Sequence, residues 1–277
     1  MLNIENSKKG TVWTVPAGKL VAAQTKLWNC LGEQGADIVI QIDDDENFRQ
    51  KVAEFMLRRG IEPSIDQRVV RAIMGVNYFD PSDWAKFYNV VCTKKQLKEL
   101  ARFPWGEDVL MSKCPLCGQV VRECHLAHVG VNTVQGNPLT FVRFREFYPP
   151  TNQSKFASYE DAWYNNEDFA SVTTLDLRWY LTHLEIVPKS ESKTTADQQA
   201  MLSADYELPL AIEETVKSFH YVRKTGKYLN PKRYARCRDL STTGGRVDVG
   251  PFVSNGFRIN CYADDAGLGA LGAGASR

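Results

Sequence analysis

The sequence has almost no excess of charge of either sign, with 34 Lys and Arg against 33 Asp and Glu and a formal net charge of +1. This balance excludes a global electrostatic attraction to nucleic acid or to an anionic membrane, so any such function must come from local patches. The chain also lacks an apolar run of about 18 residues, the length that predicts a transmembrane helix. Its first residues show no basic segment followed by an apolar core, so we expect no secretory signal and no membrane partner.

Cysteines that would suggest a disulfide framework are also missing. The chain has seven cysteines, an odd number, and four of them stand alone in the sequence: Cys30, Cys92, Cys237 and Cys261. Isolated cysteines are typical of a reducing compartment, where clustered cysteines more often bind metal. We therefore expect a cytoplasmic protein.

Familiar catalytic motifs are absent as well. The sequence contains no Walker A loop, no dinucleotide-binding glycine fingerprint, no Gly-x-Ser-x-Gly elbow and no His-Glu-x-x-His helix. No small-molecule substrate follows from the sequence, and the absence of these motifs favours a non-enzymatic protein.

The composition that is present, 43% hydrophobic and 24% charged, is typical of a folded protein. The hydrophobic patterning predicts an α+β fold, with a mostly helical N-terminal and central part, a small ββ hairpin like a zinc knuckle, and a C-terminal antiparallel β meander. We expect an N-terminal α/β region over 1–103, a central region with the knuckle over 104–188, and a C-terminal helix plus antiparallel sheet over 198–277. The polar stretch 188–197 is the best linker candidate.

Local patterns predict the following elements. Strands are expected at 11–15, 38–42, 109–111 and 129–131, and helices at 19–31, 46–59, 175–184 and 207–222. The meander is expected at 236–240, 246–249 and 257–261. The acidic run 43–46 is interpreted as a helix N-terminus rather than a metal-binding loop. The Gly/Ala-rich tail 267–277 is expected to be mobile unless something docks it.

A cluster of cysteines and histidines is the most informative feature of the chain. Its members fall within fifteen residues: Cys114, Cys117, Cys124, His125 and His128. A Cys-x2-Cys turn followed by Gly118 can direct two thiolates at one point, and zinc needs four such ligands in a tetrahedron. We predict a structural zinc site formed by Cys114, Cys117, Cys124 and His128, with His125 as the alternate ligand. The competing interpretation is that no metal binds and that the cysteines are free core thiols.

A catalytic alternative uses the same segment. His125, His128 and Asn137 follow the cysteine turn in a pattern that resembles the HNH nuclease motif, in which a histidine activates water and an asparagine orients the loop. This resemblance implies a metal-dependent nuclease-like hydrolase. The pattern departs from the motif at Ala127, where an acidic residue is usual.

A basic and aromatic stretch lies near the C-terminus. Nine Lys and Arg stand between Lys217 and Arg246, against the single acid Asp239. Phosphates can bind to such a surface while tyrosines stack on bases. The predicted polyanion-binding residues are Arg233, Arg236, Arg238, Arg246, Arg258 and Tyr234. The alternative is an ordinary solvated sheet face, neutralised by acids such as Glu213 and Glu214.

Several phrases of the second half carry a family resemblance: 177–181 (LRWYL), 185–188 (EIVP), 228–231 (YLNP) and 233–236 (RYAR). From about Pro104 onward the chain resembles a group of uncharacterised proteins from uncultured, small-genome bacteria. The resemblance implies no activity, cofactor or partner.

Three functional hypotheses therefore remain open. The first is a non-enzymatic binding or structural protein with a structural zinc site and a basic C-terminal surface for nucleic acid or a protein partner. The second is the nuclease-like hydrolase, and the third is a metal-free assembly subunit.

Overall fold

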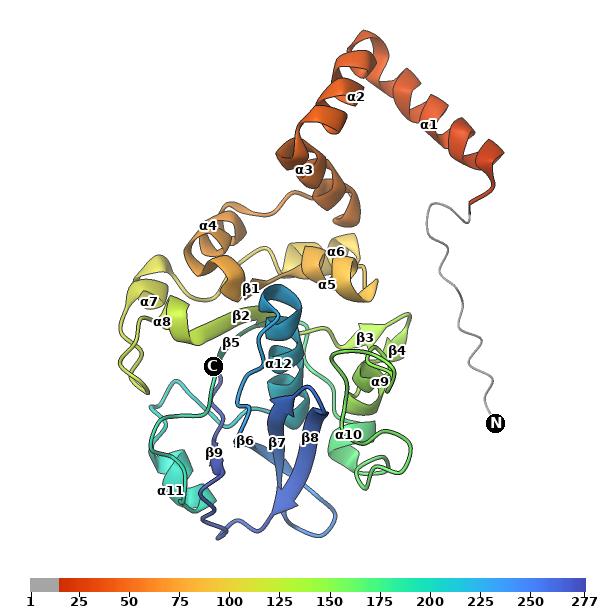
Figure 1. The fold of residues 1–277 in the computed structure, drawn as a ribbon. Coiled ribbons are helices and arrows are strands. Elements are labelled where there is room, and N and C mark those ends of the chain that lie inside the picture. The colour runs from red at the N-terminus through yellow and green to blue at the C-terminus, as the bar shows by residue number, and fades with distance from the viewer. Residues whose placement is uncertain (1–14) are drawn as a thin grey trace. The chain divides into compact units, whose positions relative to one another are not determined.

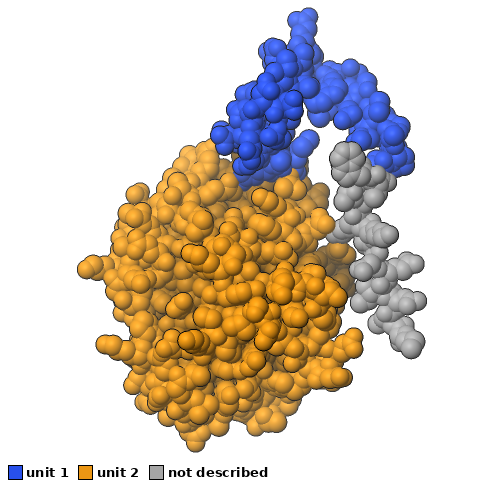
Figure 2. All heavy atoms as spheres, in the orientation of Figure 1, with its two compact units in different colours: residues 1–56 blue, residues 57–277 orange. Residues whose placement is uncertain are grey.

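The computed structural model describes residues 15–277. The chain divides into two units at Met56, and the described parts of these units are residues 15–56 and 57–277 (Figure 2). Each unit is described by itself. Most of the strand predicted at 11–15 lies outside the described residues, and Val15 itself is part of a bend. The elements are helices in the N-terminal and central parts and a strand meander at the C-terminus, so the predicted α+β class is confirmed (Figure 1).

The first unit contains helices only, as far as it is described. They are α1 (Ala17–Leu31), the short 3₁₀ helix η2 (Gly32–Gln34), α2 (Gly35–Asp44) and α3 (Glu46–Leu57), whose last residue falls in the second unit. The strand predicted at 38–42 is wrong, because these residues lie in α2. No described strand pairs with this segment, and a helix satisfies its backbone groups internally despite the β-branched residues. Of the acidic run 43–46, Asp43 and Asp44 end α2, contrary to the prediction. Asp45 accepts a hydrogen bond from Phe48 N–H at 3.0 Å, as expected for an acidic start of α3.

The second unit begins with short helices that carry well-formed caps. They are α4 (Ile65–Met74), α5 (Pro81–Tyr88) and α6 (Lys94–Glu99), with β1 (Tyr78–Phe79) before α5. Capping boxes open these helices at Ser64, Asp80 and Thr93, where a side chain and a backbone N–H satisfy each other reciprocally. The Thr-x-x-Gln spacing of residues 93–96 is the sequence signature of a capping box, so the sequence alone predicts the cap at Thr93.

A three-stranded sheet lies at the centre of the second unit. Its order is β1–β2–β5, with β2 (His125–Val129) antiparallel to β5 (Trp179–His183), and every residue of these two strands is buried. The helix predicted at 175–184 is therefore wrong. A strand that is covered on both faces loses the alternation of polar and apolar residues, so its periodicity cannot be told from that of a buried helix.

Two short helices lie on either side of the cysteine turn. They are α7 (Glu107–Met111) and α8 (Val121–Cys124), and α8 leads directly into β2. The strand predicted at 109–111 is wrong, because these residues complete α7. An isolated antiparallel bridge between Lys113 and Val120 closes the turn instead.

The segment between β2 and β5 has little regular structure, and a short helix follows β5. The elements are β3 (Thr133–Val134), β4 (Asn137–Pro138), α9 (Phe141–Arg145), α10 (Asp168–Ser171) and α11 (Thr195–Ala200). The predicted linker 188–197 runs into α11, where Thr195 and Gln198 are buried.

Helix α12 (Ala211–Thr225) and the meander complete the fold. The helix lies between the central sheet and the strands β6 (Tyr234–Leu240), β7 (Arg246–Val253) and β8 (Gly256–Tyr262), as Figure 1 shows. The predicted meander is confirmed, with β7 between β6 and β8. The predicted helix is confirmed too, although it begins at Ala211 rather than at residue 207.

The tail is docked rather than free. Its strand β9 (Leu271–Ala273) runs parallel to β6, and Ser276 bridges both Thr182 and Glu207. Residues 271–276 are buried.

One hydrophobic core extends from Val70 to Phe257 and so crosses the region boundaries predicted near residues 103 and 188. Within residues 15–277, no helix combines the length and the apolar character that crossing a membrane requires.

Candidate metal centre

The cysteine turn is shaped by its own backbone. Gly118 N–H donates to Cys114 O at 2.8 Å, and Cys114 N–H donates to Gln119 O at 2.7 Å. Gly118 has φ +77°, a left-handed conformation that glycine adopts without a steric penalty. The Leu116 N–H points at Cys114 Sγ, 3.4 Å away. The turn therefore presents thiols together with N–H groups that stabilise a thiolate.

Two further ligand candidates come from the sheet. Cys124 is the last residue of α8, and His183 is the last residue of β5. The antiparallel register pairs His125 with His183, so the end of β5 lies beside the start of β2, one residue after Cys124.

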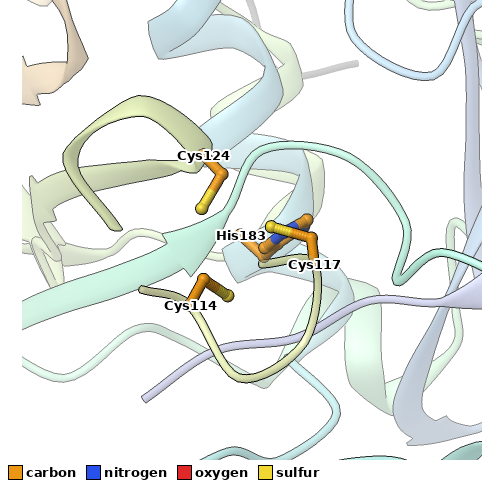
Figure 3. A group of neighbouring side chains, drawn as sticks. All are labelled: Cys114, Cys117, Cys124 and His183. Atoms are coloured by element: carbon orange, nitrogen blue, oxygen red, sulfur yellow. The ribbon is translucent and has the colours of Figure 1, made fainter. Parts of the chain in front are cut away.

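These elements bring four side chains together: Cys114, Cys117, Cys124 and His183 (Figure 3). One ligand atom from each lies within 4.8 Å of all the others. In a tetrahedral zinc site with bonds of ~2.3 Å, neighbouring sulfur atoms are about 3.8 Å apart. The described geometry is thus compatible with a metal ion held by three sulfur atoms and one nitrogen.

The histidine is oriented for coordination. His183 Nδ1 lies 2.7 Å from Glu185 O, which fixes this nitrogen as the N–H donor. The other nitrogen, Nε2, is buried and has no hydrogen-bond partner among the described residues. A metal-binding histidine commonly donates its second N–H to a carbonyl in this way, since the bond sets the tautomer and the ring orientation.

The thiols lie close enough to shift one another's pKa. The hydrogen bond with Cys124 lowers the pKa of Cys114 to about 3, against the effect of burial, and His183 and nearby backbone N–H groups act in the same direction. The same Cys114 hydrogen bond and burial raise the pKa of Cys124. A cation at the centre would relieve this conflict, because coordination favours the thiolate form of each ligand.

His128, predicted as the fourth ligand, lies elsewhere. It is fully buried, its Nε2 lies 3.1 Å from Thr182 Oγ1, and its ring stacks on Tyr180 at 5.4 Å. Successive strand residues point to opposite faces, so His128 is on the face of β2 opposite to His125. The histidine that lies with the three cysteines is instead His183, 59 positions after Cys124 in the sequence (183 − 124).

His125, the predicted alternate ligand, lies next to the cluster with both ring nitrogens engaged. Its Nδ1 is 3.2 Å from Cys124 Sγ, and its Nε2 is 3.0 Å from Tyr206 Oη. Burial lowers the pKa of His125 to about 3, which favours the neutral ring. Its contact with the Cys124 sulfur is that of a neighbour which supports a ligand.

The nuclease-like alternative needs His125, His128 and Asn137 at one site, but the structure places them apart. Asn137 is exposed on β4, where its side chain donates to Gln135 O at 3.3 Å. His125 and His128 are completely buried and face opposite sides of β2. No hydrogen bond among the described residues links Asn137 to either histidine.

Helix α12 supports the ligand strand from behind. The buried Lys217 Nζ donates to His183 O and to Leu184 O, each at 2.8 Å, and pairs with the Glu214 carboxylate. A fully buried ammonium ion therefore holds the backbone at His183, the histidine of the cluster.

The predicted polyanion surface is largely neutralised within the chain. Arg236 is completely buried, with Asp248 and Thr195 as partners, so it cannot contact a polyanion. Three other arginines are paired with carboxylates, as follows: Arg233 with Glu191, Arg238 with Glu207 and Arg246 with Asp264. Arg258 is exposed, and the Tyr234 ring packs edge-on against Tyr262.

Arg236 is buried, whereas Arg238 is partly exposed. An irregularity in the strand explains this difference in burial. The register of β6 against β7 shifts between Arg236 and Leu240. A bulge of this kind re-aims side chains that simple alternation would place on one face.

No protein-family model, curated protein or solved structure matches this chain. Its function must therefore be argued from the site itself.

Proposed function

We propose that the protein is a non-enzymatic structural protein in which Cys114, Cys117, Cys124 and His183 hold a structural zinc ion. The observation that carries this proposal is the buried His183 Nε2, which has no hydrogen-bond partner within residues 15–277 and lies with three thiols. A donor set of three sulfur atoms and one nitrogen suits zinc in a closed tetrahedral site.

The completeness of the ligand set supports a structural rather than a catalytic role. Catalytic zinc sites usually keep one position open for water or substrate. Here the chain supplies four ligands, of which Cys114, Cys124 and His183 are buried and Cys117 is half-buried. The ion would join the cysteine turn, the end of α8 and the end of β5.

A protein is favoured over nucleic acid as the binding partner of the C-terminal surface. Four of the five arginines assigned to a polyanion have an acidic partner within the chain. Paired arginines release few phosphate counterions on binding, so they contribute little to affinity for a polyanion.

Elemental analysis of the full chain, purified without added metal, tests the proposal. We expect about one zinc per chain, lost in His183→Ala and retained in His128→Asn. Cys30→Ser is the matched cysteine control, because Cys30 is exposed and outside the cluster. A metal-free wild-type protein would refute the zinc proposal and favour the metal-free assembly subunit. Loss of zinc in His128→Asn but not in His183→Ala would refute the ligand assignment.

A further inference from the structure

The described part of the first unit, residues 15–56, contains helices without a core. Gly35 is its single buried residue. The helices have 15, 10 and 12 residues, and isolated helices below ~12–15 residues are marginal in water. These residues, called the helical arm below, therefore need a surface to pack against.

Apolar side chains on the arm are available for such packing. The exposed fraction is 59% for Val21, 41% for Leu27, 40% for Val39 and 59% for Ile40. The stripe of α1 expected from periodicity, from Leu20 to Leu31, is likewise not buried. A run of accessible apolar side chains on successive helices is typical of a protein interface.

The charges on the arm are segregated and indicate what covers it. Residues 17–31 carry two lysines, Lys19 and Lys26, and no acid, whereas residues 33–46 carry six carboxylates and no Lys or Arg. Among residues 15–277, no ion pair engages Lys19, Lys26, Asp43 or Asp44. The basic helix α1 thus complements the acidic helix α2, but the two do not pair within one chain.

We propose that the helical arm is a dimerisation element, in which α1 of one copy packs on α2 of a second copy and the reverse contact forms at the same time. Reciprocal exchange gives a two-fold interface that uses the same surface on both chains and closes the assembly at two. Leu20 and Leu27, which share one stripe of α1, would be covered by Val39 and Ile40 of the other copy. Each lysine of α1 would face carboxylates of α2.

Sedimentation of the full-length protein tests this proposal. We expect a species of twice the chain mass, and we expect Leu27→Asp to weaken the dimer at least about 100-fold, because each substitution acts twice in a two-fold interface. The matched control is Val172→Asp, an exposed apolar position of the second unit at 66% accessibility, which should leave the mass unchanged. Zinc content should stay unchanged in both variants, which separates a failed dimer from a misfolded second unit.

A charge exchange makes the test specific for contact between chains. Lys19→Glu/Lys26→Glu and Asp43→Lys/Asp44→Lys should each weaken self-association about tenfold. An equimolar mixture of the two variants should recover a dimer, because both contacts of the mixed dimer are complementary. A monomeric wild type, a larger open assembly, or a mixture no better than either variant alone would overturn the proposal.

Discussion

The histidines on the two faces of the β2–β5 pair have different surroundings. On one face, His125 and His183 lie opposite each other and next to three thiols. On the other face, His128 and Thr182 contact α12 through His220 and Glu213. Both faces are buried and polar, yet among the described residues only the first gathers four side chains that could bind a metal, three cysteines and one histidine, at one point.

The difference lies in whether the buried polar atoms without a hydrogen-bond partner converge on one point with other possible ligands. On the first face the unpartnered Nε2 of His183 lies among sulfur atoms, which a metal can join. On the second face His128 Nδ1 and Glu213 Oε2 are buried without a hydrogen-bond partner among the described residues. Unsatisfied buried groups cost stability unless something compensates them. A buried polar cluster therefore indicates a metal site only when its donors converge.

The largest effect should follow from removing the proposed zinc ion. With free zinc at ~1,000 times its dissociation constant, binding stabilises the folded state by about 4 kcal/mol. We expect a chelator to lower the free energy of unfolding in urea by about this amount, and Cys114→Ser to have the same effect without chelator. Cys261→Ser, at a half-buried cysteine outside the cluster, should behave like wild type. If the chelator destabilised Cys114→Ser as much as wild type, the ion would not be at this face.

An effect of about the same size concerns Lys217, the lysine that bonds to the backbone at the end of β5. Lys217→Met removes the donor to His183 O and Leu184 O and leaves the buried Glu214 without its cation. Breaking a buried ion pair from one side costs about 3–5 kcal/mol, measurable by urea unfolding.

A matched double variant separates the charge from the packing. Lys217→Met/Glu214→Leu should recover part of the lost stability, since no unpaired charge remains. A double variant that is no more stable than Lys217→Met would mean that the lysine acts through its bonds to the strand alone.

The third effect is a pH dependence of the second face. Burial raises the pKa of Glu213 from 4.5 to about 7, so the folded state binds this proton more tightly than the unfolded state does. The stabilisation is complete below the unfolded pKa and is lost as the pH rises through about 7. Glu213→Gln should remove this loss, so its stability relative to wild type should increase by about 2–3 kcal/mol between pH 5 and pH 8. Parallel stability curves for the two proteins would contradict the assignment.

The smallest effect tests the neighbour of the cluster. Tyr206→Phe removes the hydrogen bond to His125 Nε2 and should cost about 1 kcal/mol, while the zinc content stays the same. Loss of zinc in this variant would show that His125 does more than support Cys124.

The success and failure of the sequence predictions have a common physical cause. The cysteine turn, the cap at Thr93 and the meander depend on residues close in sequence, and these were predictable. The ligand His183 depends on the pairing of β2 with β5, which brings together residues far apart in the chain. An isolated histidine gives no local signal of such pairing.

Burial on both faces explains why the sequence did not predict strand β5. The stretch 179–183 has no polar alternation, because α12 covers one face of the sheet and the core covers the other. Similarly, the basic patch was overestimated because its acidic partners, such as Glu191 and Glu207, are distant in sequence.

The docked segment 271–276 has a consequence for the order of events during synthesis. The four residues proposed as zinc ligands leave the ribosome before this segment, which supplies Ala275 O as the acceptor for His183 N–H at 2.8 Å. Since domains are synthesised from the N-terminus, the nascent chain can hold zinc before this edge of β5 is completed. The ion would then connect the start of β2 to the end of β5 and keep the two strands in register until residues 271–276 are synthesised.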